Sequence, residues 1–277
     1  MAGSLARHRV ESRKAATSPE IVKLNFKQQG DGEPLIILHG VFGSLSNWNA
    51  IARRLAEHYQ VYTLDLRNHG RSPHAESMTY PEMAQDIAGF LAQQGLASAH
   101  VIGHSMGGKV AMVLALTQPQ KVRKLMVLDI APVKYPDRFS TLLTALNQLS
   151  PGAVKTRADA DSQLARLIPA PEVRTFLLQN LSKTAEGYRW RINLPVITRA
   201  MPEISDFPQL AGRTFTGETL FVRGGDSDYI QEKFLPDIHR YFPAARVVTV
   251  ERASHWLHHE QPQRVTRLIE DFLRGDK

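Results

Sequence analysis

Short apolar runs alternate with longer amphipathic stretches along the first half of the chain. The runs at residues 34–38, 61–66 and 99–102 are continuous and short, which predicts buried strands. Residues 47–59 are amphipathic, and residues 80–94 follow a T-x-x-E capping box and begin with Tyr-Pro, so both stretches are predicted helices. Strand and helix in alternation predict an α/β fold, with a mostly parallel central sheet and helices on both faces.

The pattern differs in three parts of the chain. Residues 20–26 alternate between apolar and polar, as in an antiparallel edge strand. From residues 133–216 the strand–helix alternation is missing, while leucines recur at helical spacing and prolines interrupt them. We therefore expect a helical cap there, inserted between the two parts of an α/β core at residues 19–132 and 217–277. Residues 1–18 are basic and poor in acids, and we expect a flexible tail.

The composition is that of a globular protein. Of 277 residues, 43% are hydrophobic and 22% are charged, which suits a chain with one large core. The chain has no cysteine, which excludes disulfides, a cysteine nucleophile and zinc–thiolate sites and agrees with a cytoplasmic location. No apolar run approaches the roughly 20 residues needed to cross a membrane. The net charge of +7 lies partly in the tail, and no nucleic-acid-binding motif accompanies it, so we expect no nucleic-acid partner.

The most informative motif is G-x-S-x-G at residues 103–107. It lies between a predicted strand at residues 99–102 and a predicted buried helix at residues 109–116. A serine on such a turn has strained backbone angles and directs its hydroxyl into a cleft, while the glycines let strand and helix approach closely. We therefore predict that Ser105 is a nucleophile.

A serine nucleophile needs a base, and His255 is the candidate. It lies on the loop between a predicted last strand at residues 246–250 and a predicted last helix at residues 261–273. His258 and His259 lie further along this loop, and we expect them to cap or flank the helix rather than act as the base.

The nucleophile also needs donors for the negative oxygen of the tetrahedral intermediate. The buried strand at residues 34–38 ends in His39-Gly40-Val41, where a sharp turn at Gly40 would present the N–H of Val41 to the cleft. The second donor would be the N–H of Met106, the residue after the nucleophile.

The carboxylate that orients the base has more than one candidate. Asp129 ends the strand at residues 125–129, and Asp226 and Asp228 follow a later strand at residues 220–223. Asp228 has the G-x-x-D spacing expected of an acid on the loop after the later strand. Both candidate loops lie at the carboxyl edge of the predicted sheet.

Six segments spread over most of the chain share one resemblance. They are H-G-V-F-G-S-L-S-N-W at 39–48, D-L-R-N-H-G-R-S at 65–72, Y-P-E-M-A-Q-D at 80–86, G-H-S-M-G-G-K at 103–109, L-D-I-A-P-V at 128–133 and H-W-L-H-H-E at 255–260. Together they resemble the YbfF-type esterases, a branch of the α/β-hydrolase superfamily. The resemblance implies an α/β-hydrolase fold and assigns the acid to the aspartate of D-I-A-P, so we favour Asp129. That branch often reads G-G-N-S in the later loop, whereas this chain has G-G-D-S-D, which keeps Asp228 as the alternative.

These residues predict a serine carboxylesterase that cleaves short- to medium-chain acyl esters through an acyl-enzyme, with no metal and no cofactor. The expected partner is a small acyl ester or thioester, because an acyl-CoA thioesterase would use the same triad and is the alternative. A C–C hydrolase, a perhydrolase and a non-catalytic binding protein on the same fold are weaker alternatives. A haloalkane dehalogenase is excluded, since it would need an aspartate in place of Ser105. In the cap, the candidates to line an acyl pocket are Phe176, Leu177, Trp190 and Met201.

Overall fold

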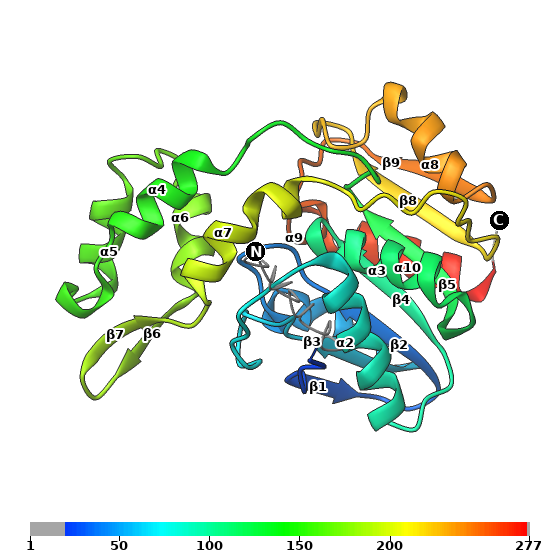
Figure 1. The fold of residues 1–277 in the computed structure, drawn as a ribbon, viewed down its shortest axis with the longest axis horizontal. Helices are drawn as coiled ribbons and strands as arrows, with labels where there is room; N and C mark the ends of the chain where they lie inside the picture. The colour runs from blue at the N-terminus through cyan, green and yellow to red at the C-terminus, as the bar shows by residue number, and fades with distance from the viewer. Residues whose placement is uncertain (1–19, 276–277) are drawn as a thin grey trace, which may run out of the picture.

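The computed structural model describes residues 20–275, and the tail expected at residues 1–18 lies outside this range. Within it, seven strands form one sheet in the order β1-β3-β2-β4-β5-β8-β9 (Figure 1). All neighbouring strands run parallel except β1 and β3, which confirms the mostly parallel sheet. The strands are β1 (Phe26–Gln29), β2 (Glu33–Leu38), β3 (Tyr59–Leu64), β4 (Ala99–His104), β5 (Val122–Leu128), β8 (Thr219–Gly224) and β9 (Ala245–Val250).

Helices pack on both faces of the sheet because successive side chains of a strand point in opposite directions. In β2, Leu35 and Ile37 belong to one apolar core, which α1 and α10 cover, while Ile36 and Leu38 belong to a second core under α2, α3 and α8. No helix of residues 20–275 is both long and apolar enough to cross a membrane. The core helices are α1 (Asn49–Leu55), α2 (Tyr80–Gln93), α3 (Met106–Thr117), α8 (Leu235–Tyr241), α9 (Leu257–Glu260) and α10 (Pro262–Arg274).

The first strand begins later than the alternation at residues 20–26 predicted. The N–H of Val22 donates to Asp86 Oδ1 at 2.8 Å, and the N–H of Asn25 donates to Ser72 Oγ at 2.8 Å. These backbone groups bond to side chains instead of a neighbouring strand, so β1 starts only at the last residue of the predicted range. The alternation here reflects side chains that pack on the core, without strand pairing.

The chain between β5 and β8 forms the inserted cap, which lies to one side of the sheet in Figure 1. It is mainly helical, as predicted, but it also contains an antiparallel hairpin that the sequence analysis missed. Its elements are α4 (Ser140–Gln148), α5 (Arg157–Leu164), α6 (Pro171–Leu178), the strands β6 (Leu181–Thr184) and β7 (Gly187–Trp190), and α7 (Leu194–Ser205).

A buried lysine holds the two segments that join the cap to the core. Lys109 of α3 is 1% exposed, and its Nζ donates to the carbonyl oxygen of Val133 at 3.0 Å, where the chain leaves the core. The same Nζ donates to the carbonyl oxygens of Ser205 at 3.3 Å and Asp206 at 2.7 Å, where the chain returns. Burial lowers the pKa of Lys109 to about 7. Both ends of the cap are therefore fixed to the helix that follows Ser105.

Replacing Lys109 with methionine keeps much of the side-chain volume but leaves these carbonyl groups without their buried donor. A buried polar group that loses its partner costs about 1–3 kcal/mol, so we expect Lys109→Met to lower the free energy of unfolding by about 2 kcal/mol. Urea denaturation measures this change. The matched control is Lys155→Met in the cap, since Lys155 is exposed and its replacement should change stability by less than about 0.5 kcal/mol. Equal effects of the two substitutions would contradict the role given to Lys109.

Candidate active site

Ser105 lies on a sharp turn between β4 and α3. Its backbone angles are φ 53° and ψ −121°, a conformation that is rare outside glycine. A Cβ atom added to Gly103 would lie 2.2 Å from the carbonyl oxygen of Gly107, and one added to Gly107 would lie 2.6 Å from that of His39. Only glycine fits at these two positions, which explains why the G-x-S-x-G motif forms this turn.

Ser105, His255 and Asp129 are brought together at the carboxyl edge of the sheet. Nε2 of His255 lies 3.0 Å from Ser105 Oγ, and Nδ1 of His255 lies 2.8 Å from Asp129 Oδ2. The three residues follow β4, β9 and β5, so strands that are distant in sequence position them. This geometry allows His255 to accept the proton of Ser105 while Asp129 holds the opposite ring nitrogen.

Asp129 is fully buried, and three donors surround its carboxylate. Oδ1 accepts a hydrogen bond from the N–H of Gly224 at 2.9 Å, and Oδ2 accepts one from the hydroxyl of Ser227 in addition to the contact with His255. No motif in the sequence indicated a role for Ser227, although it lies within the G-G-D-S-D loop. This serine and the backbone of Gly224 fix the carboxylate toward the histidine.

Asp228, the alternative acid, faces a different partner. Its carboxylate bonds to both terminal nitrogens of Arg138, at 2.5 Å to Nη1 and 2.8 Å to Nη2. The Asp228 side chain is 60% exposed, whereas that of Asp129 is buried. The ion pair with Arg138 lowers the pKa of Asp228. The structure thus brings Asp129, and not Asp228, into contact with His255.

Residues 40–43 form a tight turn beside Ser105, which we call the oxyanion turn after the role predicted for Val41. The N–H of Gly43 donates to the carbonyl oxygen of Gly40 at 3.0 Å, and Phe42 has a φ of 61°. Among the described residues, the N–H of Val41 has no hydrogen-bond acceptor. Met106 is the first residue of α3, where backbone N–H groups lack an intrahelical partner. Both N–H groups named as donors in the sequence analysis are thus available at this end of the site.

Two neutral histidines support the oxyanion turn. Nε2 of His69 accepts a hydrogen bond from the N–H of Phe42 at 3.2 Å, and its Nδ1 lies 3.0 Å from the carbonyl oxygen of Arg67. Because an N–H only donates and a carbonyl only accepts, His69 carries its proton on Nδ1. His39 accepts from the N–H of Leu66 on Nε2 at 3.0 Å, so its Nδ1 carries the proton and donates to the carbonyl oxygen of Gly40 at 2.8 Å. Burial lowers the pKa of His69 to about 3 and also lowers the pKa of His39.

Tyr229 covers the face of His255. The two rings stack with centroids 3.8 Å apart and planes at 19°, and the Arg138 guanidinium lies 4.5 Å from the centre of the Tyr229 ring on the cap side. The sequence analysis missed Tyr229, which follows the G-G-D-S-D loop directly. The stacked ring restricts the rotation of His255 and shields it from solvent.

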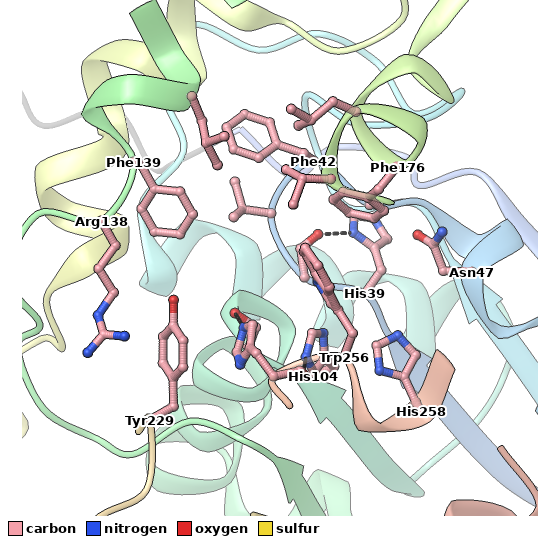
Figure 2. Close-up of a pocket in the computed structure, with 18 residues that line it drawn as sticks. His39, Phe42, Asn47, His104, Arg138, Phe139, Phe176, Tyr229, Trp256 and His258 are labelled. Atoms are coloured by element: carbon pink, nitrogen blue, oxygen red, sulfur yellow. Dashed lines mark hydrogen bonds between the residues drawn. The ribbon is translucent and has the colours of Figure 1, made fainter. Parts of the chain in front are cut away.

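Ser105 and His255 line a cavity of about 220 Å³ (Figure 2), while Asp129 lies buried behind the histidine. Figure 2 shows Tyr229, Arg138 and Phe139 on one side and Asn47, Phe176 and His258 on the other. Most of the wall is apolar, and the cap supplies much of it. The apolar lining residues include Phe42, Phe139, Leu142, Val173, Phe176, Leu177 and Trp256.

Of the four cap residues predicted to line an acyl pocket, two lie in the wall of this cavity. Phe176 and Leu177, on α6, lie in the cavity wall. Trp190 does not, because it pairs with Leu181 in the β6–β7 hairpin and packs within the cap. Met201 lies on α7 and lines a separate hollow between α4 and α7. Apolar character alone could not distinguish cap residues that pack internally from those that face the core.

A cluster of buried rings lies behind His255. The ring of His104 lies 4.7 Å from that of His255 and 4.4 Å from that of His258, which stacks on Trp48 at 4.7 Å. Nε2 of His104 donates to the carbonyl oxygen of His255 at 2.8 Å. Nδ1 of His258 is buried and has no partner among the described residues. Burial lowers the pKa of His258 to about 3 and that of His104 well below its usual range, so both rings are neutral.

Comparison with known proteins finds relatives in both sequence and structure. A family model described as alpha/beta hydrolase fold matches residues 33–262. The chain is 39% identical to the sn-1-specific diacylglycerol lipase ABHD11 of Danio rerio, over 90% of this chain and 81% of that protein. It is 35% identical to the esterase YbfF of Escherichia coli K12, over 91% of this chain and 99% of that protein. A solved structure of a marine microorganism esterase superposes with a TM-score of 0.88 at 42% identity, over 91% of this chain and 99% of that chain.

His258 should make the protein less stable in acid. The folded protein keeps His258 neutral down to a pH of about 3, whereas an unperturbed histidine takes up its proton near pH 6.5. The unfolded chain therefore binds more protons between these values, and the free energy of unfolding falls as the pH is lowered through this range. We expect His258→Phe, which keeps a ring against Trp48, to flatten the dependence of the unfolding free energy on pH. Urea denaturation at several pH values between 4 and 7 measures the slope, and an unchanged slope would contradict this assignment.

Proposed function

The chain belongs to the α/β-hydrolase fold family, in the branch of the YbfF-type esterases, and we propose that it hydrolyses carboxylic esters through a triad of Ser105, His255 and Asp129. The observation that carries this proposal is the continuous hydrogen-bonded series from Ser105 Oγ through the ring of His255 to Asp129 Oδ2, with the serine and histidine in the cavity wall. A serine hydroxyl becomes nucleophilic only when such a base removes its proton.

The reaction would proceed through an acyl-enzyme. Ser105 Oγ attacks the ester carbonyl carbon while His255 Nε2 takes the serine proton, and the N–H groups of Val41 and Met106 stabilise the resulting oxyanion. The intermediate collapses, the bond to the alcohol breaks, and His255 gives its proton to the leaving alkoxide. Water then attacks the acyl-enzyme with His255 as base, which releases the acid and restores the serine. Asp129 keeps the proton of the neutral ring on Nδ1 and stabilises the imidazolium.

The size and the lining of the cavity favour short- to medium-chain acyl groups as substrates. Its volume of about 220 Å³ and its largely apolar wall suit an aliphatic chain, and Phe176 and Leu177 would contact that chain from the cap. The same attack geometry serves a thioester, so a comparison of matched oxygen and sulfur esters of increasing chain length would define the preferred substrate. The cytoplasmic location expected from the composition stays a prediction.

Ser105→Ala tests the nucleophile. Without the hydroxyl no acyl-enzyme forms, so we expect kcat for a p-nitrophenyl ester of a short acid to fall by at least about 10⁴-fold. Labelling by a fluorophosphonate should also disappear, while the thermal midpoint stays close to that of the parent protein. Ser140→Ala is the control, since Ser140 is an exposed serine of α4 and its loss should leave both activity and labelling intact. Substantial hydrolysis by Ser105→Ala would refute the proposal.

Asp129→Asn and Asp228→Asn together test the acid. Loss of the Asp129 charge should disturb both the tautomer and the protonated form of His255, so we expect kcat to fall by about 10³- to 10⁴-fold. Asp228 is paired with Arg138 away from the histidine, and its replacement should cost less than about tenfold. Steady-state kinetics with the same ester compares the kcat of the two variants. A larger loss of kcat in Asp228→Asn than in Asp129→Asn would assign the acid to Asp228.

A further inference from the structure

Asn180 connects the cap to the oxyanion turn. It lies between α6 and β6 and is 3% exposed. Its Nδ2 donates to the carbonyl oxygen of Phe42 at 2.7 Å and is also 3.3 Å from that of Leu177. The backbone of Asn180 is held within the cap, because its carbonyl oxygen accepts from the N–H of Arg191 at 2.8 Å. The side chain of Asn180, whose backbone is held in the cap, therefore bonds to a backbone oxygen of the turn.

The oxyanion turn needs such a contact because its conformation is costly. Phe42 has a φ of 61°, where a residue with a Cβ atom loses about 1 kcal/mol or more, so its surroundings must hold it there. The core supplies His69, which accepts from the N–H of Phe42. The cap supplies Asn180, which donates to the carbonyl oxygen of the same residue. The two bonds fix the peptide groups on both sides of Phe42, next to Val41.

We propose that Asn180 is a positioning residue that makes the oxyanion turn depend on the docked cap, so that the N–H of Val41 is aimed at the reacting carbonyl only when the cap is in place. This inference rests on the proposed function. The cap would thus contribute to stabilisation of the transition state as well as to the wall of the acyl pocket.

The neighbours of Asn180 support the same coupling. Gln179 accepts a hydrogen bond from Asn47 Nδ2 at 3.1 Å, and Asn47 Oδ1 accepts from the N–H of Ser44, the residue that follows the turn. Phe176, four residues before Asn180, lies in the cavity wall. One short segment of the cap therefore lines the cavity, bonds to Phe42 within the turn and reaches Ser44, just after the turn, through Asn47.

A second cap–core contact provides a matched control. Asn193 Nδ2 donates to Asn68 Oδ1 at 3.0 Å and to the carbonyl oxygen of Ala75 at 3.3 Å. This contact also joins the cap to the core through an asparagine, but it ends on the loop after β3 and not on the oxyanion turn. The same loop carries His69, but in Asn193→Ala the backbone N–H of Asn193 still donates to the carbonyl oxygen of Asn68 at 2.9 Å, so this variant should loosen cap docking without releasing Phe42.

The kinetic test compares Asn180→Ala, Asn180→Asp and Asn193→Ala on a p-nitrophenyl ester. Removing one direct oxyanion donor typically costs about 10²- to 10³-fold in kcat, and a misaligned donor should cost less. We expect kcat to fall about 10- to 100-fold in both Asn180 variants, with KM within about threefold of the parent protein, and Asn193→Ala to stay within about threefold in both constants. Asn180→Asp keeps the side-chain shape without the donor, so it reports on the hydrogen bond if Asn180→Ala does not fold.

A transition-state analogue separates positioning from general loosening. A trifluoromethyl ketone forms a tetrahedral oxyanion with the active serine, so its affinity should fall by the same factor as kcat/KM in the Asn180 variants. The affinity for the matched unreactive alkanol, which has no carbonyl or carboxylate oxygen to enter the oxyanion site, should change by less than about threefold. Equal effects of Asn180→Ala and Asn193→Ala, or a raised KM with kcat intact, would overturn the inference.

The Ser105→Ala variant separates this inference from the proposed function. If Ser105→Ala is inactive while the Asn180 variants match the parent protein, this inference fails and the proposed function stands. If Ser105→Ala is active, the proposed function fails first.

Discussion

The buried carboxylate of Asp129 is the group on which the arrangement of the site depends. It lies at the end of β5 and binds a backbone N–H at the end of β8, the hydroxyl of Ser227 and the ring of His255 beyond β9. A buried charge is tolerated only when such donors surround it. The Asp129 carboxylate therefore holds three separate chain segments together through hydrogen bonds. It also fixes the proton on Nδ1 of His255, which leaves Nε2 free to face Ser105. The relative position of His255 and Ser105 therefore follows from the hydrogen bonds that this one carboxylate requires.

The sequence allowed much of this site to be predicted because its parts are local. The turn at Ser105 is encoded by glycines that no other residue could replace, and the positions of His255 and Asp129 follow from the ends of strands that apolar runs define. The fold itself was predicted from the same strand–helix alternation. The acid could not be chosen by spacing alone, since Asp228 satisfies the local pattern and only Arg138, distant in sequence, directs it elsewhere.

The features that the sequence did not reveal depend on contacts between distant segments. Residues 20–26 alternate like a strand, yet Asp86 takes the N–H of Val22, so local periodicity was a poor guide there. Trp190 and Met201 are as apolar as Phe176, but the hairpin and α7 direct them away from the cavity. The roles of Ser227, Tyr229 and Asn180 likewise come from their partners across the fold. A residue's chemical type was informative only where a motif also fixed its position.

The strands on either side of the cap are adjacent in the sheet, with Leu125 of β5 in register with Thr219 of β8. The chain leaves and returns at nearly one place, where Lys109 binds both segments. An insertion made between neighbouring strand ends can change in length and shape without altering the pairing of any strand. The cap, which we propose contacts the acyl group, can therefore vary while Ser105, His255 and Asp129 keep their places at the strand ends. In this fold, substrate selectivity can therefore change independently of the residues proposed to carry out hydrolysis.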